Sequence, residues 1–247
     1  MDFNGKRVLI TGGGSGVGAD MARAFAARGA EVWIGGRRRE RLVETASLHP
    51  NIKFQELDVV DPTSVAAFFN AAGSVDIVIA NAGIVDSVPL AKLSDQGWAD
   101  MISINLTGVF NTYRAAVQTM TGGWGRIIAV SSIAGVKGLA YAAHYSAAKH
   151  GVVGLTRSLA LEVAKSGVTV NAICPGYLDT EMTETAVAGI SDKSGRSPDE
   201  ALAAITAGNP MRRLIRKEEV TDAALWLAGD GASSVNGQAI TLSGGDP

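Results

Sequence analysis

The stretch Thr11-Gly12-Gly13-Gly14-Ser15-Gly16-Val17-Gly18 lies between the first apolar run of the chain and a helical pattern that continues to Arg28. A strand that leads through a glycine-rich turn into a helix forms an anion site, because free backbone N–H groups and the helix dipole both favour negative charge there. Glycines also let the backbone approach a pyrophosphate closely. The stretch therefore predicts dinucleotide binding; the alternative is a glycine-rich turn that binds no ligand.

The glycines fit two different spacings. Gly14-x-Gly16-x-x-Ala19 matches the general dinucleotide-binding pattern, whereas Gly12-x-x-x-Gly16-x-Gly18 after Thr11 has the wider spacing of one particular enzyme family. The loop alone does not distinguish them, so the choice depends on the rest of the chain.

Short runs rich in Val and Ile alternate with longer amphipathic stretches, which is the βαβ pattern of a parallel sheet. The runs are continuous rather than alternating, as in strands covered by helices on both faces. The predicted strands are Arg7–Ile10, Glu31–Ile34, Ile52–Leu57, Asp76–Ala80, Arg126–Val130, Thr169–Ile173 and Ala239–Leu242. We therefore expect one α/β domain over residues 1–247, with a doubly wound, seven-stranded parallel sheet.

Helix starts are marked by capping residues. Asp61-Pro62, Ser94-Asp95 and Ser197-Pro198 each place a capping side chain at the start of a helical pattern. The second of these predicts one long helix as far as Met120. The segment from Glu181 to Arg213 departs from the βαβ pattern because it is long, polar and poor in strand signals. We expect this irregular insertion, residues 181–213, to be a substrate lid.

Composition excludes several classes of function. The formal net charge of −2 argues against a dedicated nucleic-acid-binding protein, which usually has a strongly basic surface. The single cysteine, Cys174, excludes an intrachain disulfide, and its apolar neighbours predict a buried strand end. The three histidines and this cysteine form no metal-binding pattern, so no metal site is expected. Neither a signal peptide nor a membrane-spanning run is evident, and a cytoplasmic protein is expected.

The end of the second predicted strand bears on the choice of cofactor. NAD-binding proteins place an acidic residue there for the ribose 2′-hydroxyl. This chain instead has Gly36 followed by Arg37, Arg38 and Arg39, and a guanidinium suits a 2′-phosphate. We expect NADP(H) to be preferred over NAD(H), although the arginines also fit a solvated helix start.

The remaining motifs identify a family. With Thr-Gly-x-x-x-Gly-x-Gly at residues 11–18, the chain resembles the short-chain dehydrogenases/reductases from Lys6 to Gly245. Further motifs follow in the order and spacing of that family: Asp58-Val59, Asn81-Ala82-Gly83, Asn105, Ser131-Ser132, Tyr145-x-x-x-Lys149, and Pro175-Gly176 with Leu178 and Thr180. The resemblance implies a Rossmann fold. It also implies cofactor contacts from Gly12, Ser15, Gly16, Val17, Gly18, Arg37, Asp58, Val59, Asn81, Ala82, Gly83, Tyr145, Lys149, Pro175, Gly176, Leu178 and Thr180.

The same resemblance assigns catalytic roles. Tyr145 would be the general acid/base, Ser132 would hydrogen-bond the substrate oxygen, and Asn105 would anchor a water in a proton relay with Lys149. Residues at i and i+4 share a helix face, so Lys149 can stand beside Tyr145 and lower its pKa from about 10. Each residue alone is more typical of the core or of a helix cap; the set in this order favours catalysis.

Substrate and assembly follow from the resemblance only in outline. The run from His144 to Glu162 resembles 3-oxoacyl thioester reductases and polyketide ketoreductases, so a 3-oxoacyl substrate is expected. Another small secondary or cyclic alcohol, a steroid or a sugar is the alternative. A third hypothesis is a cofactor-binding sensor without catalysis, which the intact catalytic set disfavours. Pocket residues are expected at Ala134, Val136, Tyr141, His144 and Tyr177. The family also implies a homotetramer.

Overall fold

The computed structural model describes residues 1–246, apart from the side chains of Met182, Ala186, Ile190 and Lys193. Within that range, seven strands form one parallel sheet in the order β3-β2-β1-β4-β5-β6-β7. The strands are β1 Arg7–Thr11, β2 Glu31–Gly36, β3 Ile52–Glu56, β4 Ile77–Ala80, β5 Gly125–Val130, β6 Val168–Pro175 and β7 Ala239–Leu242. The predicted strands and the doubly wound sheet are confirmed, with boundaries that differ by at most two residues.

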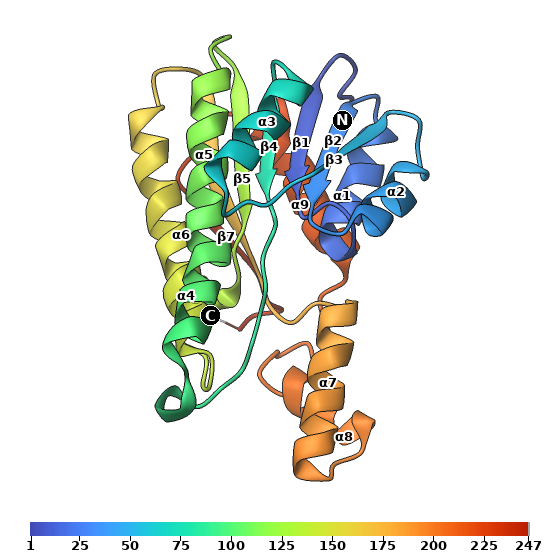
Figure 1. Cartoon of the computed structure of the whole chain (residues 1–247), viewed down its shortest axis with the longest axis vertical. Helices are drawn as coiled ribbons and strands as arrows, with labels where there is room; N and C mark the ends of the chain where they lie inside the picture. The colour runs from blue at the N-terminus through green and yellow to red at the C-terminus, as the bar shows by residue number, and fades with distance from the viewer. Residues whose placement is uncertain (247) are drawn as a thin grey trace.

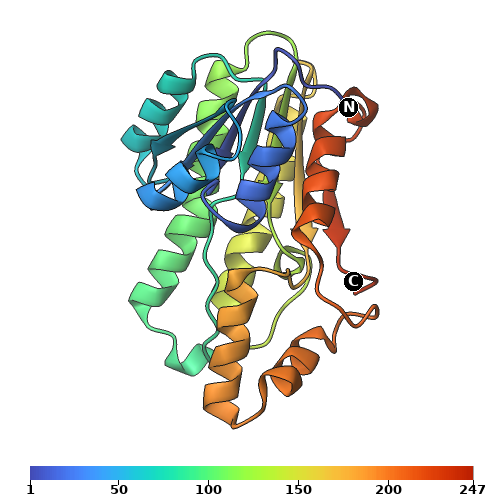
Figure 2. The same cartoon turned by 90° about the vertical axis from the view of Figure 1, so that its right-hand side faces the viewer.

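Helices cover both faces of the sheet (Figures 1 and 2). They are α1 Gly16–Ala26, α2 Arg39–Ala46, α3 Pro62–Ala72, α4 Asp95–Ile102, α5 Gly108–Thr119, α6 Ala143–Glu162, α7 Glu181–Ser194, α8 Pro198–Thr206 and α9 Lys217–Ala228. Among the residues described, no helix is long and apolar enough to cross a membrane. The strand order reverses between β1 and β4, and ligands of such sheets bind beyond the carboxyl ends of the strands at that point.

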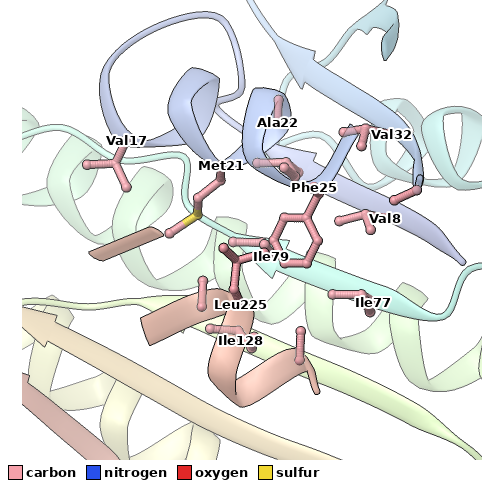
Figure 3. Close-up of a cluster of buried hydrophobic side chains, with 14 of the residues drawn as sticks. Val8, Val17, Met21, Ala22, Phe25, Val32, Ile77, Ile79, Ile128 and Leu225 are labelled. Carbon is pink, nitrogen blue, oxygen red and sulfur yellow. The ribbon is translucent and has the colours of Figure 1, made fainter. Parts of the chain in front are cut away.

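Alternate residues of the central strands bury into two separate cores. Val8 of β1 packs with Phe25 of α1 and Leu225 of α9 on one face (Figure 3). Leu9, on the opposite face, belongs to the core formed by α3, α5 and α6. A buried hydrogen bond of 2.7 Å from Thr221 Oγ1 to Asp20 Oδ2 joins α9 to α1 within the first layer.

The predicted long helix from Ser94 to Met120 is not uniform. Ser94 caps its start by accepting a hydrogen bond from Gly97 N at 3.1 Å, as expected. A π-helical segment, Ser103–Thr107, then separates α4 from α5. The Asn105 side chain donates to Met101 O at 3.2 Å, and such a bond competes with the regular backbone ladder. The prediction of one continuous α-helix was therefore wrong in its middle, at the position of Asn105.

The segment 181–213 is mostly helical rather than irregular. α7 and α8 project beyond the carboxyl edge of the sheet, well below the strands in Figure 1. Ser197 accepts from Glu200 N at 3.3 Å, while the Glu200 carboxylate accepts from Ser197 N at 2.8 Å, so the predicted start of α8 is confirmed. The helix α7 was missed because its sequence is polar and lacks a clear apolar stripe.

Candidate active site

The glycine loop connects β1 to α1 with backbone that only glycine adopts easily. Gly12 and Gly16 have φ values of +68° and +54°. A Cβ added to Gly18 would lie 2.3 Å from Gly12 O, so a side chain there would push the loop away from the helix. Ser15 precedes α1, and within the described residues it makes no side-chain capping hydrogen bond. The first backbone amides of α1 therefore face outward. This cradle fits the pyrophosphate of a dinucleotide.

Asn81, at the carboxyl end of β4, holds the glycine loop in place. Its Nδ2 donates to Thr11 O at 3.1 Å and to Gly12 O at 3.0 Å. In return, Thr11 Oγ1 accepts from Asn81 N at 3.0 Å and Ala82 N at 3.1 Å. These four bonds join β1 to β4 where the strand order reverses. The structural role of the Thr11 hydroxyl was missed in the sequence, although its position directly before the glycines is the available signal.

Lys149 lies in the interior, one helical turn after Tyr145 on α6. Its ammonium donates to Val130 O at 2.9 Å and lies 5.7 Å from the centre of the Tyr145 ring. Burial lowers the pKa of Lys149 to about 8. The side chain thus joins α6 to the carboxyl end of β5. The sequence could not predict which backbone carbonyl accepts the hydrogen bond from Lys149, because every residue has a carbonyl group.

Ser132 follows β5 and starts the short helical turn Ile133–Gly135. Its hydroxyl accepts from Ala134 N at 3.1 Å. Ser131, its neighbour, donates to Lys149 O at 3.2 Å, and a Cβ on Gly135 would lie 2.7 Å from the same carbonyl. Close packing of this turn against α6 therefore positions Ser132 relative to Tyr145.

The pKa of Tyr145 differs from the sequence-based expectation. Burial raises it, and a hydrogen bond with the Ser132 side chain opposes that rise. The net direction is upward, opposite to the lowering expected from Lys149. The physical reason is that Tyr145 loses solvent on packing, which the spacing of two residues on a helix cannot reveal.

Asn105 reaches the same cluster from the π-helical segment. Its Oδ1 accepts from Ile84 N at 3.2 Å. A Cβ on Gly83 would lie 2.7 Å from that oxygen and 3.7 Å from Lys149 Nζ. The segment after β4 thus lies between Asn105 and Lys149, and only glycine leaves room there.

The other predicted cofactor contacts surround this cluster. Thr180 precedes α7, and its Cγ2 lies 3.9 Å from a Cβ placed on Gly16. Gly176, directly after Pro175, donates its N–H to Leu242 O at 2.9 Å, and Leu178 bridges to Ile215. These residues therefore lie at the carboxyl edge, together with the glycine loop.

Asp58 and Val59 follow β3 at the same edge of the sheet. Val59 is buried and packs close to Gly108. The Asp58 carboxylate accepts from Val60 N at 3.0 Å. Both residues thus lie at the carboxyl end of β3, at the same edge as the glycine loop.

Arg37 and Arg38 are both exposed after β2, and the structure distinguishes them. Arg38 Nη2 donates to Ser15 Oγ at 3.1 Å, so this guanidinium lies against the glycine loop. Arg39, the next in the run, instead pairs with Glu56 at 3.3 Å. The contact between Arg38 and Ser15 was missed, because it joins two loops whose relative placement the sequence does not show.

The expected pocket residues do not all reach solvent. Val136, Tyr141 and Tyr177 are exposed, whereas Ala134 and His144 are buried. Tyr141 has a φ of +62°, unusual for a residue with a side chain. Its carbonyl accepts from Val88 N at 2.7 Å, which holds that conformation. His144, in contrast, is buried and packs in the interior.

Comparison with known proteins decides between the two glycine spacings. Residues 6–190 match the family described as short chain dehydrogenase. The chain belongs to the short chain dehydrogenase family. This short chain dehydrogenase is accordingly an oxidoreductase, and the wider spacing from Gly12 to Gly18 is the relevant one.

Relatives resemble this short chain dehydrogenase over nearly their whole length. A Streptomyces virginiae protein, named as the putative ketoacyl reductase of the monensin polyketide synthase, is 39% identical and covers 96% of this chain and 95% of its own. The 3-oxoacyl-acyl-carrier-protein reductase FabG of Escherichia coli K12 is 36% identical, covering 99% and 98%. A single-residue variant of actinorhodin polyketide ketoreductase, solved with NADPH, superposes with a TM-score of 0.91 at 36% identity, covering 97% and 96%.

Proposed function

We propose that the protein reduces a 3-oxoacyl thioester to the 3-hydroxyacyl product with NADPH, or runs the reverse reaction. The observation that carries this proposal is the packing of Ser132, Tyr145, Lys149 and Asn105 around one point at the carboxyl edge. The names of the relatives support the choice of a ketoacyl substrate.

Each of these side chains has a role in such a reaction. A bound reduced nicotinamide supplies the hydride. Tyr145, whose pKa burial raises, keeps its proton at neutral pH and donates it to the carbonyl oxygen. The Ser132 hydroxyl orients that oxygen. Lys149 would hold the nicotinamide ribose. A water anchored by Asn105 would relay a proton from solvent through Lys149 to Tyr145.

Initial rates with matched substrates test the proposal. We expect kcat/KM with NADPH to be at least about 10-fold higher for an acetoacetyl thioester than for a cyclic ketone, a steroid ketone or a keto sugar of equal concentration, because a pocket distinguishes substrates by contacts beyond the reacting carbon. A higher value for one of the others would identify the alternative alcohol class. No turnover with any of them would favour the non-catalytic sensor.

The cofactor would be held by the glycine loop, the ends of β3 and β4, and the segment after β6. We propose contacts from the residues expected for them in the sequence: Gly12, Ser15, Gly16, Val17, Gly18, Arg37, Asp58, Val59, Asn81, Ala82, Gly83, Tyr145, Lys149, Pro175, Gly176, Leu178 and Thr180. Preference for NADP(H) would come from Arg37, with Arg38 held nearby by Ser15.

Replacing Arg37 by alanine should lower kcat/KM for NADPH by about 10- to 100-fold, as expected for loss of a charged hydrogen bond. The value for NADH should barely change. Arg39→Ala is the matched control, since Arg39 belongs to the same exposed run but pairs with Glu56. Initial rates with both cofactors measure the effect; equal losses for the two cofactors, or a native preference for NADH, would contradict it.

The helices α7 and α8 would cover the bound substrate, with the whole chain acting as one domain. An ion pair of 3.5 Å between Arg41 and Glu181 joins the start of α7 to α2. The proximity of Thr180 to Gly16 places the base of α7 beside the glycine loop. Closure of such a segment would exclude water from Tyr145.

A homotetramer with D2 symmetry is the expected assembly, because large apolar side chains remain exposed on the helices of one layer: Trp98 of α4, Phe110 and Val117 of α5, and Leu161 of α6. Exposed large apolar side chains on neighbouring helices support an interface between copies of the chain, and the family likeness supports the tetramer. Light scattering should give four times the chain mass at micromolar concentration, and Phe110→Glu should lower the measured mass. A native monomer would contradict this assembly.

A further inference from the structure

A cavity of about 350 Å³ lies at the amino edge of the sheet, where β5 and β6 begin. The helices α7 and α8 project from the opposite edge (Figure 1). Trp124, Arg126, Thr169, Asp230 and Ser233 are among its lining residues. Ser132, just beyond the end of β5, lies six positions after Arg126, which corresponds to roughly 20 Å of extended chain. The cavity is thus separate from the candidate active site.

Arg126 is the unusual group in this cavity, because it is a buried cation that forms no ion pair within the described residues. The residue is only 2% exposed. Its Nη1 donates to Gly125 O at 2.8 Å and Gly167 O at 3.3 Å, while its Nε is buried without a hydrogen-bond partner. Over residues 1–246, no ion pair forms between this guanidinium and a carboxylate. A buried charge left in this state is costly.

Trp124 fixes the orientation of this guanidinium. The Arg126 guanidinium carbon lies 4.3 Å from the centre of the Trp124 ring, and Lys6 Nζ lies 3.7 Å from it. Lys6 is paired with Asp76 at 3.3 Å, so of the two cations beside this ring it is Arg126 that forms no ion pair among residues 1–246. The hydroxyl groups of Ser233 and Thr169 supply additional hydrogen-bond donors in the lining.

Asp230 limits the charge that the cavity can accept. Its carboxylate acts on Arg126 at a distance and raises its pKa, yet burial has the larger effect and lowers it. A multiply charged ligand would be repelled by Asp230 more than a singly charged one. The ligand must therefore be small, carry little negative charge, and hydrogen-bond the guanidinium. A group that presents two oxygens to the planar guanidinium meets these requirements.

We propose that this cavity binds a small oxyanion, a carboxylate or a phosphate group, through the guanidinium of Arg126. This inference does not depend on the identity of the substrate at the carboxyl edge. A ligand that binds only the folded chain raises its thermal stability by mass action, which gives a readout other than turnover.

Thermal unfolding with saturating NADPH provides the test, because the cofactor then already occupies the glycine loop. Inorganic phosphate and acetate are titrated separately, each against sodium chloride at equal ionic strength. We expect at least one of them to raise Tm by several degrees more than chloride, with a response that saturates. The anion that raises Tm identifies the class of oxyanion that binds. If neither phosphate nor acetate raises Tm above the sodium chloride series, the proposal is overturned.

Three variants locate the response. Arg126→Met should abolish it, whereas Lys165→Met, which removes an exposed cation near the same edge, should leave it intact. Asp230→Asn should lower the half-saturating concentration by at least about 3-fold, since it removes a competing negative charge. An unchanged response in Arg126→Met would overturn the proposal. If that variant does not fold, an unchanged half-saturating concentration in Asp230→Asn would overturn it instead.

Discussion

Replacing Tyr145 by phenylalanine should reduce kcat by at least about 10²-fold, the usual contribution of a positioned general acid. The ring remains, so α6 keeps its packing, but the proton that burial holds on the phenol is lost. The hydrogen bond with Ser132 disappears at the same time. Steady-state reduction of a 3-oxoacyl thioester measures the effect.

Tyr113→Phe is the matched control for this variant. Tyr113 packs between α5 and α6, where its hydroxyl bonds to Thr156 at 2.9 Å, and it belongs to neither the catalytic set nor the expected pocket. Removal of its hydroxyl should change kcat by less than about 3-fold, because this group lies outside reach of the substrate. NADPH affinity, measured by fluorescence titration, should be nearly unchanged in both variants. Near-native turnover of Tyr145→Phe would refute the assignment of Tyr145 as the acid.

Replacing Lys149 by methionine should lower kcat by at least about 10²-fold and also stabilise the cofactor-free protein at pH 7. Burial lowers the pKa of Lys149 to about 8, whereas the unfolded chain has a value near 10.4. That difference corresponds to a cost on the order of 3 kcal/mol for keeping the charged group folded. The lost hydrogen bond to Val130 O offsets about 1 kcal/mol of the gain.

The pH dependence separates this effect from simple repacking. Below pH 8, both states bind the proton and the cost is present in full. Between pH 8 and about 10.4, the unfolded chain binds a proton that the folded one has released, so native stability rises with pH. Urea unfolding should therefore show the advantage of Lys149→Met at pH 7 shrinking at pH 9.5. A difference that is the same at both pH values would contradict the burial of a charged amine.

The strands were predictable because a parallel sheet covered on both faces requires continuous apolar runs, and those are visible in one sequence. The capped helix starts at Ser94 and Ser197 were visible for a similar reason, since the capping side chain is local to the helix it starts. The π-helical segment at Asn105 was not, because its distortion depends on one side chain bonding to the preceding turn.

The candidate site was predictable as a set of residues but not as an arrangement. The family motifs identified Ser132, Tyr145 and Lys149. The contacts and burial of these side chains became known only from the folded structure. Whether Tyr145 has a raised or a lowered pKa depends on how much solvent it loses, and solvent exposure is a property of packing. The approach of Arg38 to Ser15 joins residues 23 positions apart across two loops, which no local pattern encodes.

The hydrogen bond between Asp20 and Thr221 spans 201 positions of the chain, and it has a consequence for synthesis. The apolar face of α1 packs against α9, which leaves the ribosome among the last elements. Loop-closure entropy must be overcome before so distant a contact forms, so folding is slow relative to a protein with local contacts. Phe25 can pack against Phe3 early in synthesis, but the side of α1 that α9 covers stays exposed until α9 is made. A chaperone that shields this side of Met21 and Phe25 would improve the yield of native protein.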